Sequence, residues 1–153
     1  LDAANGFIEI ADRSPETRPQ IAKRRRELLA YDRDPKVARP VLEQLVKVYL
    51  LWQELMIHFP KRSRYTLGEK IDEFFLDTIE YLHGASAADR TKKVVYLEHA
   101  VRKFDLLKFM LRVAWQAKAL DNKKYTAVSE QLFEIGRMIG GWHRKFSQET
   151  PVH

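Results

Sequence analysis

The chain contains no cysteine, and this absence excludes several kinds of protein at once. Without cysteine there can be no disulfide framework, no thiolate nucleophile and no thiolate metal site. Nothing in the sequence resembles a cleavable secretory signal, so we expect an intracellular, cytoplasmic protein. Leu1 is not a start methionine, so we expect the printed chain to be trimmed or processed.

Long apolar runs are also missing. The most apolar stretch, residues 41–59, is interrupted by Glu43, Lys47 and Glu54. A membrane-spanning helix needs roughly 18 or more consecutive apolar residues. We therefore predict that no segment crosses a membrane.

Proline is absent between Lys61 and Thr150. Because proline disrupts the interior of a helix, this interval favours long helices. We expect residues 1–39, where three of the six prolines lie, to form an N-terminal extension with one short helix. Its basic run, residues 23–26, either touches nucleic acid or is a solvated helix face, which is the commoner interpretation. Residues 147–153 are expected to form a polar tail.

Apolar residues that recur every three or four positions predict four helices between residues 40 and 146. The expected ranges are 40–57, about 63–84, 89–120 and 122–146. The expected boundary residues are Pro40 in the first helical position, Ser63 or Thr66 as the second cap, Gly84–Ser86 as the second stop, and Asp89 and Asp121–Asn122 as the later caps. The predicted fold is all-α, an up-down-up-down four-helix bundle.

The third predicted helix has more apolar surface than one bundle needs. From Phe104 onward its apolar residues lie almost all the way round, which is typical of a helix that is buried on more than one side. We predict a homo-oligomer interface at Phe109, Met110 and Val113, and packing under the N-terminal extension is the alternative. Three polar residues continue the apolar stripe and form either an ion-paired row or a lined groove: Asp105, Lys108 and Arg112.

Three glycines interrupt the fourth predicted helix, at positions 136, 140 and 141. Each glycine inside a helix costs about 1 kcal/mol relative to alanine. We therefore predict that another backbone or surface approaches closely there, within the bundle or between subunits. Gly136 and Gly140 join the candidate interface residues.

The sequence offers little catalytic chemistry. Di-iron bundles need two Glu-x-x-His pairs, and Glu80-x-x-His83 occurs once. No glycine-rich loop carries a phosphate-binding lysine, and no nucleophile and base can be paired among the five histidines. We predict no metal, no cofactor and no catalytic residue.

A net charge of +6 favours a polyanionic partner. In an up-down bundle the first and third loops lie at the same end, where basic residues should converge. Tyr65 and Tyr125 stand beside these cations, an arrangement suited to phosphate contacts with base stacking, or to packing at the bundle end. The predicted nucleic-acid contacts are Lys61, Arg62, Arg64, Lys123 and Lys124 at that end, and Arg137, Arg144 and Lys145 on the fourth helix.

Three segments resemble signatures of one four-helix-bundle family: FPKRSRYTLGEKI (59–71), FDLLKFMLRVAWQAKALDNKKY (104–125) and EIGRMIGGWHRKF (134–146). That family contains the accessory variability determinant (Avd) of diversity-generating retroelements, and the 23S ribosomal RNA intervening-sequence proteins share its bundle. The similarity covers about residues 41–146, whereas residues 1–39 match no known part of the family.

The resemblance implies a ring-like homopentamer with a basic surface. Such a protein would bind the reverse transcriptase of the element and its template RNA, or an RNA–DNA hybrid. It would support mutagenic complementary-DNA synthesis without being catalytic itself. The alternatives are a protein of the 23S ribosomal RNA intervening-sequence type, or a helical structural adaptor with no nucleic-acid role.

Overall fold

The computed structural model describes residue 19 and residues 35–149. The short helix expected within residues 1–39 and its basic run lie outside the described residues. So do the last four residues of the expected polar tail.

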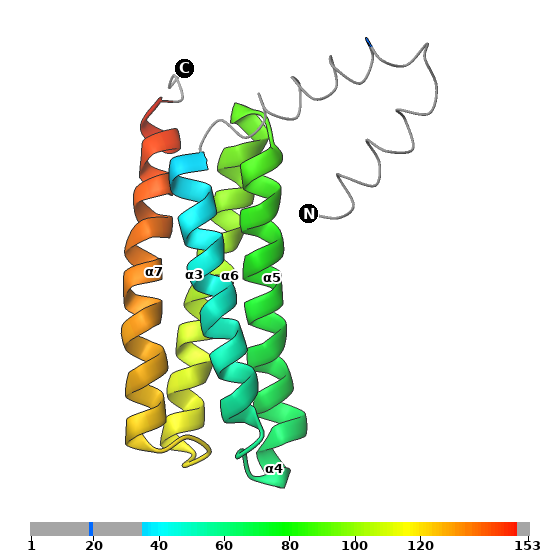
Figure 1. Cartoon of the computed structure of the whole chain (residues 1–153), viewed down its shortest axis with the longest axis vertical. Helices are drawn as coiled ribbons and strands as arrows, with labels where there is room; N and C mark the ends of the chain where they lie inside the picture. Colours follow the sequence, from blue (N-terminus) through cyan, green and yellow to red (C-terminus); the bar gives the residue numbers. More distant parts are fainter. Residues whose placement is uncertain (1–18, 20–34, 150–153) are drawn as a thin grey trace. The chain divides into compact units, whose positions relative to one another are not determined.

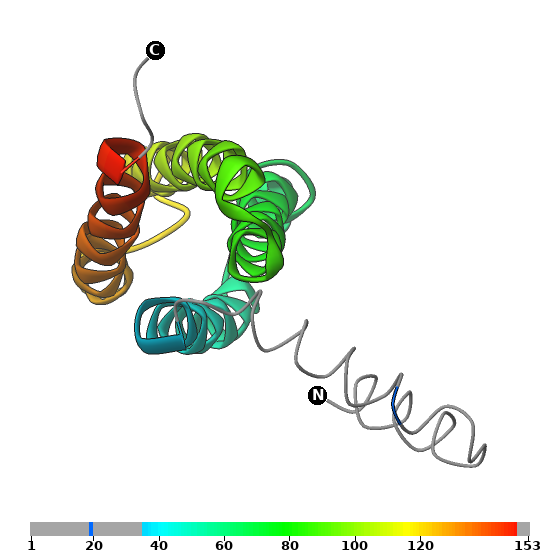
Figure 2. The same ribbon diagram turned by 90° about the horizontal axis from the view of Figure 1, so that it is seen from above.

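The described part of the chain confirms the all-α fold. Four long helices run α3 (Pro35–Met56), α5 (Glu69–Ala87), α6 (Arg90–Gln116) and α7 (Asn122–Glu149), and they alternate in direction (Figure 1). Each helix packs beside the next one in the chain, and α7 closes the ring against α3 (Figure 2). The result is an up-down-up-down bundle.

The first helix begins earlier than predicted. We expected Pro40 at its first position, but α3 begins at Pro35 and Pro40 lies inside it. Proline lacks the N–H that would bond the carbonyl four residues earlier, so only one hydrogen bond near the helix start is lost. The helix therefore tolerates Pro40 without ending there.

Two expected boundaries of the second helix are wrong. After Pro60 the chain forms a short helix, α4 (Lys61–Ser63), and continues through a π-helical turn, η2 (Arg64–Gly68), directly into α5. Neither Ser63 nor Thr66 caps α5, and the Thr66 hydroxyl donates to the Ser63 carbonyl at 3.4 Å. The predicted stop at Gly84 is helical, and α5 ends at Ala87.

The predicted caps of the other two helices are confirmed. The Asp89 carboxylate accepts the backbone N–H of Lys92 at 3.0 Å at the start of α6. The Asp121 carboxylate accepts that of Lys124 at 2.8 Å beside the first turn of α7. Short polar side chains that bond free backbone N–H groups favour a helix start at these positions.

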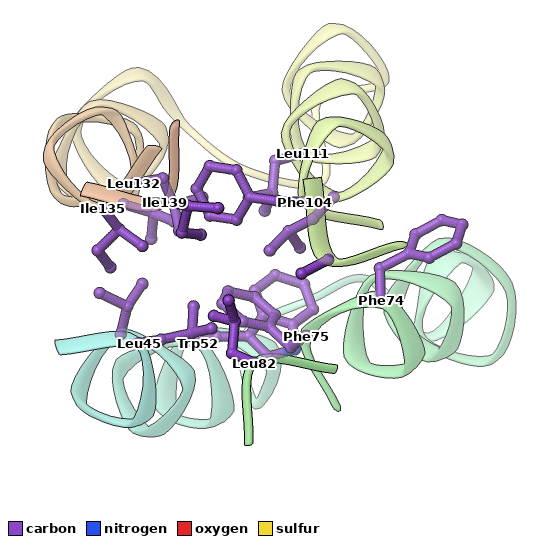
Figure 3. Packing of buried hydrophobic residues seen from close by; sticks show 14 of the residues in the cluster. Leu45, Trp52, Phe74, Phe75, Leu82, Phe104, Leu111, Leu132, Ile135 and Ile139 are labelled. Atoms are coloured by element: carbon purple, nitrogen blue, oxygen red, sulfur yellow. The ribbon is translucent and has the colours of Figure 1, made fainter. Parts of the chain in front are cut away.

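Large side chains from all four helices fill the space between them (Figure 3). Trp52 of α3 packs edge-on against Phe59 and is stacked against Phe75, with ring centroids 5.3 and 6.0 Å apart. In α3, Val41, Leu45 and Val48 are buried in this core, whereas Val46 is exposed.

One face of α6 is buried in the bundle. It runs through Leu97, Ala100, Phe104, Leu107, Leu111 and Ala114, and it includes Lys93, whose Nζ lies 5.2 Å from the centre of the Phe146 ring. The polar line of Asp105, Lys108 and Arg112 is exposed. Within it, Lys108 Nζ and an Asp105 oxygen form the predicted ion pair at 3.4 Å. Because both groups are exposed, this pair contributes little stability.

The close approach predicted at the α7 glycines exists at Gly136, and it lies inside the bundle. A Cβ atom at Gly136 would stand 3.1 Å from Phe104 of α6, whereas one at Gly140 would meet only the Arg144 side chain, at 3.7 Å. A tighter approach occurs where none was predicted, because a Cβ at Gly84 would stand 2.8 Å from the Tyr96 ring. Gly136 is therefore explained without a second subunit.

Candidate nucleic-acid interface

Positive charge is concentrated at one end of the bundle. The connection from α3 to α5 and the connection from α6 to α7 both lie at the lower end in Figure 1. We call residues 57–66 and 115–125 the basic end. These residues hold six lysines and arginines and one aspartate, a net charge of +5 out of the +6 of the whole chain. The remaining residues are nearly neutral together.

Two exposed cations lie in the first loop of the basic end. Lys61 and Arg62 lie in α4 and are exposed. Arg64, which we also predicted as a nucleic-acid contact, is half-buried, and its Nη2 donates to the carbonyls of Ile57 and Phe59 at 3.1 and 3.3 Å. Both carbonyls lie in the loop just after α3. Arg64 therefore holds the loop in shape.

The second loop ends α6 four residues earlier than predicted. The N–H of Lys118 bonds the Trp115 carbonyl at 3.0 Å and that of Ala119 bonds the Ala114 carbonyl at 2.8 Å, which together form a Schellman motif. Lys118 has a φ of 64° in this motif, a conformation that usually requires glycine. Holding a side chain there costs about 1–2 kcal/mol, and strain of this kind is often found at functional sites.

The start of α7 adds two more predicted cations. Lys123 is exposed, and Lys124 is half-buried with its Nζ 3.9 Å from the Asp121 carboxylate. Asp121 is the single acid of the basic end, and its other oxygen accepts the Lys124 N–H. Its charge is thus directed at the helix start, where a carboxylate is favourable.

Aromatic rings lie among these cations. Tyr65, in η2, is 63% exposed. Tyr125 instead stacks on Trp115, with ring centroids 4.8 Å apart and an angle of 7° between the rings. The Trp115 indole N–H donates to the Asn122 side-chain oxygen at 2.7 Å. Trp115 itself remains 36% exposed. Spacing alone had placed Trp115 with the apolar excess of its helix, so its place beside the cations was missed.

The other three predicted cations form a separate group on α7. Arg137, Arg144 and Lys145 are all exposed. At 1.5 Å per residue, Arg137 lies about 21 Å along the helix from Lys123. Arg137 also pairs with Glu134 at 3.5 Å. The eight predicted contacts therefore divide into two groups, of which the basic end is the denser.

The predicted oligomer surface is only partly exposed. Phe109 is 58% exposed and Val113 is half-buried, whereas Met110 packs against the core. Phe133 of α7, which was not predicted, is 65% exposed. Because α6 and α7 are antiparallel and meet at Phe104 and Gly136, Phe109 and Phe133 lie at nearly the same height, about 3 Å apart along the bundle.

Among residues 35–149, no three histidine, aspartate or glutamate side chains are grouped so as to hold a metal ion. Glu80 and His83 are both exposed on α5. Within the same residues, no helix combines the length and the apolar character that crossing a bilayer would require.

The described residues form a small all-α bundle with one basic end. A family model described as bAvd-like matches residues 39–146, more than half of the chain. The chain therefore belongs to the bAvd-like family, which confirms the resemblance to Avd proteins. The family is of an accessory, non-catalytic kind. No match was found among curated proteins.

Proposed function

We propose that this protein is a non-catalytic accessory factor of a diversity-generating retroelement. In this proposal it binds the template RNA and the reverse transcriptase of the element and supports mutagenic complementary-DNA synthesis. Membership of the bAvd-like family supports the accessory role. The observation that carries the RNA-binding part is the net charge of +5 at the basic end.

Charge of this kind binds nucleic acid through phosphate contacts. Each cation that neutralises a phosphate releases a counterion, so the affinity falls steeply as salt rises. Lys61, Arg62 and Lys123 are exposed and have no acidic partner among the described residues that would neutralise them. Repetition of the basic end around a homo-oligomer such as a pentamer would multiply these contacts and raise the affinity by avidity.

The dependence of RNA affinity on salt tests this proposal. Five phosphate contacts predict a slope of about −3.5 to −4.5 in a plot of log affinity against log salt for each copy engaged. The measurement is a filter-binding or anisotropy titration of the whole chain with the template RNA. A slope near zero, or no retention of RNA at low salt, would contradict the RNA-binding role. Co-purification with the reverse transcriptase of the same element tests the second partner.

Phe109→Glu is expected to dissociate the oligomer and leave the monomer folded. Phe109 is largely exposed in the single chain, so a carboxylate at this position stays hydrated in the monomer. In the assembly the same carboxylate would be buried without a partner, which is costly. Met110 is left unchanged because it packs against the core. The molar mass by light scattering should fall to that of one chain.

Leu50→Glu is the matched control, because Leu50 of α3 has the same exposed fraction, 58%. Its mass should equal that of the unchanged protein. If Phe109→Glu also keeps the original mass, Phe109 does not lie in a subunit interface.

A further inference from the structure

The basic end carries aromatic side chains that phosphate binding alone does not require. Tyr65 lies in the connection from α3 to α5 and Trp115 lies in the last turn of α6, and both remain accessible near lysines and arginines. Ile57, in the same loop as Tyr65, is 70% exposed. Exposed aromatic side chains among cations are typical of surfaces that bind single-stranded nucleic acid.

We propose that the basic end binds single-stranded nucleic acid, by stacking unpaired bases on Tyr65 and on Trp115. This inference rests on the proposed RNA-binding function and names the form of nucleic acid that the site accepts. Grooves that bind single strands combine cations along the backbone with aromatic rings on which bases stack. The basic end has both features, and its cations come from the same two segments as the rings, residues 57–66 and 115–125.

Trp115 is held ready for such a contact. One face of its indole lies on Tyr125, nearly parallel, and its N–H is already bonded to Asn122. The ring therefore keeps its orientation without a ligand, and stacking needs no further polar partner. A group that is ordered before binding loses less conformational entropy on binding.

Tyr65 is placed by an unusual backbone turn. It lies in η2, a π-helical turn between α4 and α5, and turns of this type are frequent at functional sites. Arg64, the preceding residue, bonds two carbonyls of the loop that follows α3 and so holds the turn. Tyr65 projects from this anchored segment with 63% of its surface exposed.

Duplex RNA is a poor ligand for such a surface. Its bases are stacked on one another and offer no free face, whereas bases in single strands, loops and ends can be splayed out onto aromatic side chains. Both forms carry phosphates, so charge alone would accept either one. A preference for the single strand therefore distinguishes stacking from charge.

Tryptophan fluorescence offers a direct measurement. The chain has three tryptophans, and Trp52 and Trp142 are at most 1% exposed. Stacking of a base on the accessible Trp115 should quench the emission. The whole chain is titrated at low salt with a short single-stranded RNA and with a duplex that has the same number of phosphates. We expect roughly tenfold tighter binding of the single strand, accompanied by quenching.

Two variants test whether Trp115 and Tyr65 cause the quenching and the preference for the single strand. Trp115→Leu should remove the quenching and weaken single-strand binding by roughly tenfold, while duplex binding changes little. Tyr65→Leu should weaken it similarly, and it carries little risk to the fold because the side chain is exposed. Trp142→Phe, a change far from the basic end, should leave both the quenching and the affinity unchanged.

Each remaining outcome has a definite meaning. Equal, salt-dependent binding of both RNA forms without quenching would overturn this inference and leave the proposed function standing. Failure to bind either form would overturn both. If poly-glutamate binds as tightly as the single strand and quenches Trp115 equally, the surface accepts an acidic protein and the inference is wrong.

Discussion

Changing Lys61, Arg62 and Lys123 together to glutamate is expected to lower RNA affinity roughly 1,000-fold at about 0.1 M salt. Each change removes a phosphate contact and adds a repulsive charge, and together they reverse the sign of the basic end. All three side chains are exposed, so the bundle should remain folded. Arg64 is left unchanged because it bonds two carbonyls of the loop. The slope of log affinity against log salt should fall towards zero.

A matched triple change elsewhere separates local charge from net charge. Arg39, Lys47 and Lys92 are exposed, lie outside the basic end, and alter the net charge by the same amount when changed to glutamate. This control should lose less than about tenfold in affinity, because distant charges are screened by salt. If both triple variants bind RNA equally, the basic end is not the contact surface.

Lys118→Gly gives a second control in which stability and binding move in opposite directions. Glycine relieves the strain of a φ of 64°, which should raise the free energy of unfolding by about 0.5–1 kcal/mol after allowance for its greater chain entropy. The same change removes one cation and should weaken RNA binding several-fold. A gain in stability without a loss of affinity would show that Lys118 does not touch the RNA.

Gly136→Leu is expected to reduce the free energy of unfolding by about 1–3 kcal/mol. A Cβ atom there already stands 3.1 Å from Phe104, and this phenylalanine is buried in the core. The added branches of leucine would force α6 and α7 apart. Urea denaturation followed by circular dichroism measures the loss.

Gly140→Leu is the contrasting variant on the same helix. Its Cβ would meet only the Arg144 side chain, and leucine favours helix over glycine by about 0.8–1 kcal/mol. The isolated bundle should therefore become slightly more stable. If this variant keeps its stability but loses oligomer mass, Gly140 lies at a subunit contact, as the sequence suggested. Equal destabilisation by both changes would contradict the assignment of the close approach to Gly136 alone.

Much of the bundle could be predicted because its helices obey local rules. The interval without proline and the three- and four-residue spacing identified all four long helices and their order. Asp89 and Asp121 were recognised as caps because capping depends on short polar side chains close in sequence. The predicted ends of α3, α5 and α6 were wrong, because the backbone at these ends does not follow the usual conformational preferences of the residues. Pro40 lies inside a helix, and Lys118 takes a conformation typical of glycine.

The sequence predicted most of the cations that lie at the basic end, but it did not predict the contacts that their side chains make. Topology alone brought Lys61, Arg62, Lys123 and Lys124 to one end, as the structure places them. The hydrogen bonds of Arg64 and the stacking of Trp115 on Tyr125 join residues at positions that no periodicity relates. Lys118 was overlooked because α6 was expected to continue to residue 120.

The sequence by itself determined the all-α class, the up-down topology and the excess of positive charge at the paired loops. These follow from hydrophobic period, proline placement and chain direction, which are all local or nearly so. Only the tertiary structure decided that Arg64 is bonded within its loop and that Tyr125 stacks on Trp115. It also decided that the close approach at Gly136 lies inside the bundle. Those outcomes depend on how side chains from different helices meet, and that is settled by packing in three dimensions.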